Sequence, residues 1–262
     1  MKPKITILTA CYNGAAHIEE TIQSVIAQCY DNLEYVIVDG GSTDGTLDII
    51  KKYEKYVDVL ISEPDNGISD AFNKGIKVAT GDLICIVNSD DVLIENALNQ
   101  FASKYIPGYD IYRCNQVFWN DKTDTKTRDV PTMNFPIPPL SLHICHNATF
   151  ISKELYEKCG GYKIFFKYIM DLDFFVRAYK QGAKFFYINV DVVNFRLGGV
   201  SQSHNKQKWK EYMEVISGNG GTRLSKLVFY IYLKTRFFAK KLVMLINPDF
   251  RLILTQKKIK WK

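Results

Sequence analysis

The chain has 262 residues, of which 47% are apolar and 24% charged, and its formal net charge is +6. This composition is typical of a globular protein and excludes disordered, collagen-like and coiled-coil classes. The length is enough for one large domain or two small ones. Six cysteines occur without a C-x-x-C pair, and four lie in apolar stretches, which predicts reduced, buried thiols in a cytoplasmic protein. The sequence contains no run of about 20 apolar residues, the length that would predict a membrane span.

The basic residues are concentrated near the carboxyl end. Residues 222–262 contain eleven lysines and arginines but one acidic residue, so this tail carries +10 and residues 1–221 carry −4. The pattern over 224–246 predicts an apolar, aromatic helix interrupted by four basic residues. Such a helix either lies in a membrane interface or packs on the body with its basic face in water. We favour an anionic membrane surface as the partner, with no nucleic acid, which places the protein peripherally at the inner face of the cell membrane.

The first hundred residues repeat one unit, a short apolar strand followed by an amphipathic helix. Apolar runs that end in polar turns predict strands over residues 5–8, 35–38, 57–61 and 83–87. Apolar stripes at helical spacing predict helices over residues 18–29, 44–56 and 69–79. The alternation indicates an α/β fold with a mostly parallel central sheet and helices on both faces.

A polar cluster follows each of these four strands. The clusters cover residues 9–13, 39–42, 65–67 and 88–91. In parallel sheets, ligands bind beyond the carboxyl ends of the strands. We therefore expect four polar loops to converge on one rim of the sheet.

The next hundred residues have a different pattern. They predict further strands over residues 111–119, 148–151 and 184–195 and helices over 153–159 and 171–181. A charged hairpin or loop is expected over 122–128 and a sharp turn at Gly160-Gly161. We expect this part to extend the same sheet with mixed strand directions.

Three carboxylates at strand ends are candidate ligand-binding groups. Asp90 and Asp91 repel each other unless a cation lies beside them, so they either bind a divalent ion with phosphates or form a solvated turn before a helix. Asp39 either caps a turn or hydrogen-bonds a nucleotide. The chain has neither G-x-G-x-x-G nor G-x-x-x-x-G-K-[ST], which argues against dinucleotide dehydrogenases and phosphate-loop nucleotidases.

Asp171 opens a helix after an apolar, aromatic segment. It is either a general base with a raised pKa or a helix cap. Asp173 is expected to pair with Arg177 four residues on. His143 and His146 are poorly spaced for a shared metal, and each is expected to make a single polar contact.

Several motifs together resemble the family-2 glycosyltransferases of the GT-A fold, and in particular bacterial surface-polysaccharide enzymes. The resemblance covers roughly residues 4–200. The matching motifs, in chain order, are residues 9–13, 38–46, 62–67, 73–75 and 88–91. It implies a nucleotide-sugar half over 1–109, an acceptor half over 110–221 and a separate tail over 222–262.

On the donor side, the resemblance implies a metal site and a nucleotide site. Asp90, with Asp91 beside it, matches the ligand of Mg²⁺ or Mn²⁺ in an acidic triplet whose first position is Asn88 here. Five further positions match donor-binding residues: Asp39 at the base, Thr9 and Tyr12 around it, Gly67 by the diphosphate, and Ser89. Where relatives carry a late histidine on the metal, the segment 196–201 has none, and His204 is the nearby candidate.

On the acceptor side, Asp171 matches the carboxylate that activates the acceptor hydroxyl. The resemblance implies an inverting transfer from a nucleotide-sugar donor, a UDP-sugar by preference, to a lipid-linked saccharide. Two alternatives stay open, a sugar-nucleotide nucleotidyltransferase and a non-catalytic regulatory partner. Nucleotidyltransferases have a glycine-rich entry loop after the first strand, and residues 9–14 of this chain do not match it.

Overall fold

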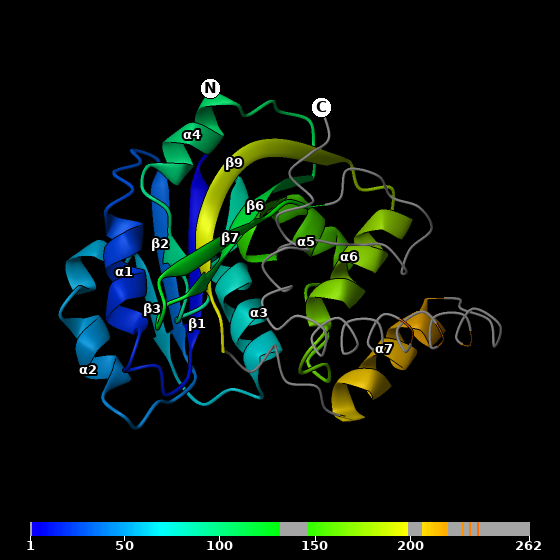
Figure 1. Ribbon diagram of the computed structural model, residues 1–262, viewed down its shortest axis with the longest axis horizontal. Helices are drawn as coiled ribbons and strands as arrows, with labels where there is room; N and C mark the ends of the chain where they lie inside the picture. The colour runs from blue at the N-terminus through cyan, green and yellow to red at the C-terminus, as the bar shows by residue number, and fades with distance from the viewer. Residues whose placement is uncertain are drawn as a thin grey trace.

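The computed structural model describes residues 2–131, 146–198 and 206–219, together with Leu227, Ile231 and Thr235. The first part of the chain alternates strands and helices, so the repeat predicted from the sequence is confirmed (Figure 1). Its elements are β1 (Ile5–Cys11), α1 (Ile18–Ile26), β2 (Leu33–Asp39), α2 (Thr46–Lys51), η1 (Glu54–Tyr56), β3 (Val59–Ser62), α3 (Ile68–Val78) and β4 (Leu83–Ile86).

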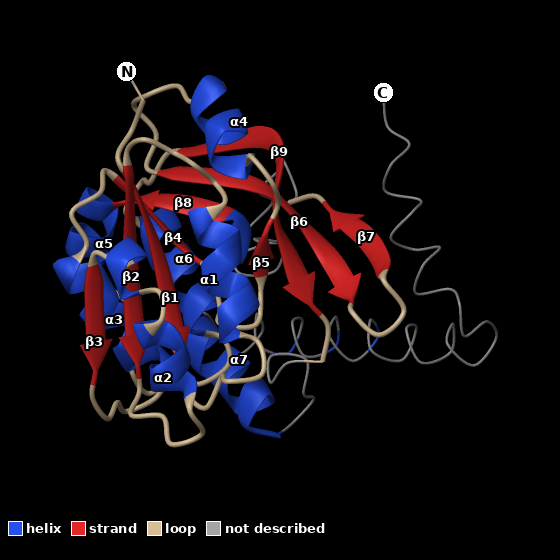
Figure 2. Ribbon diagram, turned by 90° about the vertical axis from the view of Figure 1, so that its left-hand side faces the viewer, coloured by secondary structure: helices blue, strands red, loops and turns tan. Residues whose placement is uncertain are grey.

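One sheet runs through the described residues. Its strand order is β3-β2-β1-β4-β8-β6-β9-β5, and β7 pairs with β6 as a hairpin. The first four strands in this order are parallel, whereas β4–β8, β6–β8, β6–β7 and β5–β9 are antiparallel, so the expected mixed extension is confirmed. Figure 2 looks onto the face covered by α1 and α2, with the β6–β7 hairpin at the far end of the sheet. The later strands are β5 (Val92–Leu93), β6 (Ile111–Asn120), β7 (Thr125–Asp129), β8 (Thr149–Ser152) and β9 (Phe185–Arg196).

Helices cover both faces of the sheet, as predicted. Neighbouring side chains of β1 point to opposite faces, so Ile7 belongs to one core and Leu8 to the other. Helices α1, α2 and α4 pack on the Ile7 face, and α3, α5, α6 and Val215 of α7 pack on the Leu8 face. The remaining helical elements are α4 (Ala97–Ser103), η2 (His146–Ala148), α5 (Lys153–Cys159), α6 (Met170–Lys180) and α7 (Lys206–Gly218).

Three features differ from the sequence-based expectation. Strand β1 runs three residues further than predicted, because its ladder with β2 continues to the pair Cys11–Asp39. Strand β5, which pairs with β9, and helix α7 were not predicted. His143, Cys145, His204 and most of the predicted tail helix lie outside the described residues. The described helices include none that is long and apolar enough to cross a membrane.

The cysteines agree with the prediction of reduced thiols. Five of them lie in the described part of the chain, and all five are free. Cys29 is exposed, and the other four, Cys11, Cys85, Cys114 and Cys159, are buried.

Glu34 is a buried carboxylate that joins β2 to its neighbours. Its oxygens accept hydrogen bonds from the hydroxyl groups of Thr6 and Thr80 and from the Thr80 N–H, and Lys4 lies 3.6 Å away. Burial alone would raise the pKa of Glu34, but these hydrogen bonds and the Lys4 ammonium outweigh it and lower the pKa.

We expect Glu34→Gln to lower the free energy of unfolding at pH 7 by about 1–3 kcal/mol, because glutamine is uncharged and has an NH2 group in place of one of the two acceptor oxygens. The folded pKa lies below the unfolded one, so this contribution is present above about pH 4.5 and is lost as pH falls through the folded value. Urea denaturation of both proteins at pH 7 and at pH 3–4 measures it. Glu63→Gln, at an exposed ion pair with Lys74, is the control and should cost under about 1 kcal/mol.

Candidate active site

The β1–α1 and β2–α2 loops are joined by four hydrogen bonds. The Asn13 N–H donates to Ser42 Oγ at 2.8 Å, and the Thr43 N–H donates to Asn13 Oδ1 at 2.9 Å. The next two N–H groups of the β1–α1 loop donate to Thr46 Oγ1 at 2.8 Å and to Asp44 Oδ2 at 3.0 Å. These two loops therefore form one rigid unit.

The other two loops lie against this unit. A Cβ at Gly40 would be 2.3 Å from Asp65 Oδ2, so the β3–α3 loop approaches as closely as it does because residue 40 is glycine. A Cβ at Gly14 would be 3.3 Å from Ser89 Oγ in the loop after β4. The predicted convergence of four polar loops on one rim is confirmed.

Thr9 and Asp39 lie beneath this rim. Both are fully buried. The Tyr35 hydroxyl donates to Thr9 Oγ1 at 3.4 Å. The Asp39 carboxylate accepts from the Ser42 N–H at 3.2 Å and from Ser62 Oγ at 2.8 Å. Both side chains are therefore engaged within the protein, in contrast to Tyr12, which is 66% exposed on the same rim.

Asp91 is, like Asp39, a fully buried carboxylate. Its Oδ2 accepts from the amides of Asn88 and Asn147, both at 3.0 Å, and its Oδ1 accepts from the Arg196 N–H at 3.0 Å. Burial, and after it the negative charge of Asp90, raise the pKa of Asp91 to about 7. The three hydrogen bonds act in the opposite direction without outweighing burial.

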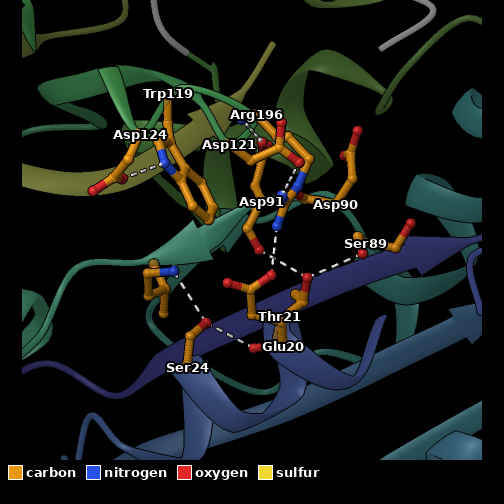
Figure 3. Close-up of polar contacts among 11 residues, drawn as sticks. Glu20, Thr21, Ser24, Ser89, Asp90, Asp91, Trp119, Asp121, Asp124 and Arg196 are labelled. Atoms are coloured by element: carbon orange, nitrogen blue, oxygen red, sulfur yellow. Dashed lines mark hydrogen bonds and ion pairs between the residues drawn. The ribbon is translucent and has the colours of Figure 1, made fainter. Parts of the chain in front are cut away.

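Asp90 differs from Asp91 in having a free carboxylate. The backbone oxygens of Ser89 and Asp91 accept from Thr21 Oγ1 at 3.0 and 2.8 Å, and the Asp90 oxygen accepts from Arg196 Nε at 2.9 Å. No described residue hydrogen-bonds the Asp90 carboxylate, and Figure 3 shows it turned away from the network. The backbone oxygens of Ser89, Asp90 and Asp91 are therefore engaged, whereas the Asp90 carboxylate has no hydrogen-bond partner among the described residues.

The donor set fits a cation that is held mainly by its substrate. Within the described ranges, no three His, Cys, Asp or Glu side chains gather around one point, so the protein alone does not enclose a metal ion. Mg²⁺ and Mn²⁺ prefer oxygen ligands, and Mg²⁺ is commonly bound by one or two carboxylates together with substrate phosphates. The half-buried Asp90 side chain meets that requirement.

Element η2 connects this loop to Asp171. Asn147 donates to Asp91, and its neighbour His146 places Nδ1 3.8 Å from Asp171 Oδ2. Burial lowers the pKa of His146, although the Asp171 carboxylate acts in the opposite direction. Two consecutive residues thus contact Asp91 of the acidic loop (residues 88–91) and Asp171.

Asp171 lies in the first turn of α6, whereas Ile169 precedes the helix as its cap residue. Its Oδ1 accepts the Leu172 N–H at 2.8 Å, and its side chain stays one-third exposed. Asp173 instead is fully buried and pairs with Arg177 at 2.7 Å, as the sequence predicts, and with Lys163 at 3.0 Å. Of the two carboxylates, Asp171 alone reaches solvent.

Helix α7 packs against the segment that precedes Asp171. Buried Glu211 accepts the N–H groups of Lys167 at 3.1 Å and Tyr168 at 2.9 Å. Burial lowers the pKa of Lys208, against the opposing charges of Asp171 and Glu211. Sequence patterns do not reveal this role of α7, because the two residues of each contact lie 43 or 44 positions apart in the chain.

The first four strands of the sheet are parallel, and the polar and acidic loops gather at their carboxyl ends, which is where proteins of the α/β class bind their ligands. The model of the family described as "Glycosyl transferase family 2" matches residues 6–168, more than half of the chain. The chain therefore belongs to this family and is a glycosyltransferase. The family resemblance and the GT-A fold predicted from the sequence are confirmed.

The names of two curated relatives assign them to PGL/p-HBAD biosynthesis and to teichuronic acid biosynthesis. A PGL/p-HBAD biosynthesis glycosyltransferase of Mycobacterium bovis is 28% identical over 215 residues, 77% of this chain and 80% of that protein. The putative teichuronic acid biosynthesis glycosyltransferase TuaG of Bacillus subtilis is 39% identical over 93 residues, 34% of this chain and 37% of that protein.

Two solved structures share the fold. S. aureus TarS 1–349 in complex with UDP-GlcNAc has a TM-score of 0.66 at 20% identity, over 81% of this chain and 64% of that one. The mannosyltransferase PcManGT from Pyrobaculum calidifontis, in complex with GDP-Man and Mn²⁺, has a TM-score of 0.61 at 19% identity, over 83% and 64%. The chain spans less than two thirds of the length of these solved chains.

Proposed function

We propose that this glycosyltransferase moves a sugar from a UDP-sugar to a hydroxyl group of a lipid-linked saccharide, with inversion, in surface-polysaccharide synthesis. The observation that carries the proposal is the Asp90 carboxylate, which has no hydrogen-bond partner among the described residues. Its neighbour Asp91 bonds Asn147, and the adjacent His146 contacts Asp171. The names of the relatives support the glycan context, and TarS with UDP-GlcNAc supports the donor.

On the donor side, Asp90 would hold Mg²⁺ or Mn²⁺. When bound, the cation neutralises the charge that develops on the diphosphate leaving group. Both oxygens of Asp91 already accept hydrogen bonds, so we assign it the role of supporting Asp90 instead of binding the metal itself. In this scheme Asn88 supports the loop by donating to Asp91.

The nucleotide would lie on the rim formed by the four loops. Tyr12 offers an exposed aromatic ring, and we assign the diphosphate to the side of Gly67, where a Cβ would meet nothing within 4 Å, and of Ser89. Thr9 and Asp39 are buried, so we propose that they shape the base-binding loop from below. Asp39 does so by holding the Ser42 N–H.

On the acceptor side, Asp171 would take the proton of the attacking hydroxyl. A single displacement at the anomeric carbon requires the base and the leaving group on opposite faces of the sugar. Burial lowers the pKa of His146, which favours the neutral imidazole beside the Asp171 carboxylate. The proton therefore moves to Asp171 while the diphosphate departs on the Asp90 side.

The segment before Asp171 presents an apolar tip. Ile164 and Phe165 are 53% and 59% exposed, although hydrogen bonds from Ser69 to the Phe166 oxygen and from the next two N–H groups to Glu211 hold the segment in place. Exposed apolar groups on a fixed loop indicate a binding surface. We propose that this tip, with the basic tail over 222–262, meets an anionic membrane at its cytoplasmic face.

We expect the double variant Ile164→Ser/Phe165→Ser to bind anionic vesicles at least tenfold more weakly than the wild type, because burying each side chain in lipid contributes roughly 1.5–3 kcal/mol. Co-sedimentation with vesicles containing anionic lipid measures this. Ile106→Ser is the matched control, since Ile106 is 52% exposed in the loop between α4 and β6. Equal binding of the wild type and the double variant would show that the tip does not contact the membrane.

A donor panel tests the proposed function. UDP-, GDP- and dTDP-sugars are compared by thermal shift with and without Mn²⁺, since a ligand that binds the native state raises its stability. We expect the largest shift with a UDP-sugar and Mn²⁺, followed by sugar transfer to a lipid-linked saccharide. Turnover of a nucleoside triphosphate with a sugar phosphate would instead identify a nucleotidyltransferase. Donor binding without any turnover would identify a regulatory partner.

A further inference from the structure

Arg196, the last residue of β9, sits at the point where four separate segments meet. Its Nη1 donates to Asp121 after β6, its Nη2 donates to Glu20 of α1, both at 2.5 Å, and its Nε donates to the Asp90 backbone oxygen at 2.9 Å. Figure 3 shows the guanidinium between these groups, with the Trp119 ring beside it. The guanidinium carbon lies 4.4 Å from the centre of that ring.

The surroundings fix the guanidinium in one orientation. Trp119 is itself held by Asp124, which accepts its Nε1–H at 3.0 Å. A planar fork between an aromatic face and two carboxylates is an arrangement that arginine makes and lysine does not. Because all three guanidinium nitrogens donate within the protein and the residue is 7% exposed, Arg196 is not itself a phosphate ligand.

Arg196 makes two hydrogen bonds to the acidic loop. Its side chain binds the backbone oxygen of Asp90, and its backbone N–H binds the side chain of Asp91. These contacts fix the peptide that links the two aspartates. The direction of the Asp90 side chain follows from the backbone to which it is attached.

We propose that Arg196 is a positioning residue that fixes the Asp90 backbone and so preorganises the free Asp90 carboxylate for a divalent cation. The inference rests on the proposed function, because it assigns the cation to Asp90. It adds a coupling between the acidic loop and the β6–β7 hairpin, since Asp121 and Trp119 contact the same guanidinium that bonds the Asp90 backbone.

The test compares Arg196→Lys with the wild type by isothermal titration calorimetry in the full chain. Mn²⁺ is titrated in the presence of saturating UDP, and UDP is titrated without metal. We expect Mn²⁺ to bind 10–100-fold more weakly in Arg196→Lys, as is common when a residue that supports a metal ligand is changed. The affinity for UDP without metal should stay the same.

A matched control is Arg128→Lys. Arg128 of β7 also donates to two side chains, Asp191 at 2.5 Å and Asn189 at 2.6 Å, but neither belongs to the acidic loop. Its Mn²⁺ affinity should equal that of the wild type. Glu20→Gln, which leaves Arg196 in place but weakens one anchor, should show a smaller loss in the same direction, and it decides the question if Arg196→Lys does not fold.

The outcomes separate the inference from the proposed function. A lowered melting temperature of Arg196→Lys with an unchanged Mn²⁺ affinity would show a purely structural role and overturn the inference. Unchanged Mn²⁺ affinity in Glu20→Gln overturns it if Arg196→Lys cannot be purified. A wild-type protein that binds neither UDP nor any other sugar nucleotide with Mn²⁺ overturns the proposed function first.

Discussion

Replacing Asp90 with asparagine is expected to lower sugar transfer at least 10³-fold, which corresponds to about 4 kcal/mol of transition-state stabilisation. Asparagine keeps the size and backbone contacts of Asp90 but removes the charge that a divalent cation requires. The Arg196 and Thr21 bonds go to backbone oxygens and remain, so the melting temperature should change little. Initial rates with a UDP-sugar, at several Mn²⁺ concentrations, measure the effect.

Thermal shift gives a second readout that does not depend on turnover. In the wild type, Mn²⁺ should increase the stabilisation by UDP, and in Asp90→Asn this increase should vanish while stabilisation by UDP alone persists. Asp48→Asn, at an exposed carboxylate of α2, makes the same charge change away from the rim and is the control. Wild-type activity in Asp90→Asn would show that the metal does not bind at this loop.

The N-terminal half of the fold could be predicted because its signals are local. Each strand and helix shows in the spacing of its own apolar residues, and the direction of parallel strands places the polar loops on one rim. Strand length was less predictable. Thr9 lies inside β1 because the ladder with β2 extends to Cys11, a property of two strands together.

The roles of adjacent aspartates could not be predicted from their order in the chain. Asp90 and Asp91 look alike in the sequence, and the structure separates them through partners far along the chain. Asn147 and Arg196 reach Asp91 from 56 and 105 residues away. No local pattern records contacts of that length, so the sequence could place the acidic pair but not say which carboxylate stays free.

The acceptor half follows the same logic. A turn of two glycines was predicted at Gly160-Gly161, and the structure gives the reason for the second one. A Cβ at Gly161 would be 2.5 Å from Asn73 Oδ1, which accepts the Tyr162 N–H at 2.8 Å. Helix α3 therefore holds the segment that leads to Asp171.

The second large effect is expected for Asp171→Asn. A general base contributes roughly 10²–10⁴-fold, so kcat for transfer should fall by about that factor, since asparagine cannot accept the proton of the acceptor hydroxyl. The Asp171 side chain is one-third exposed, and its described contacts are the Leu172 N–H, His146 and the charge of Lys208, so the stability of the fold should change little. Donor affinity should also be unchanged, because the rim proposed to bind the nucleotide is contacted by Asn147 of η2, whereas Asp171 is contacted by His146.

Asp173→Asn provides the matched control two residues along the same helix. Asp173 is fully buried between Arg177 and Lys163, so its replacement removes the buried charge that pairs with both and should cost roughly 3–5 kcal/mol of stability. The two variants should thus separate: Asp171→Asn loses turnover and keeps its melting temperature, whereas Asp173→Asn loses stability and keeps most of its kcat at low temperature. If Asp171→Asn transfers sugar as fast as the wild type, Asp171 is not the base, and the proton of the acceptor leaves by another group.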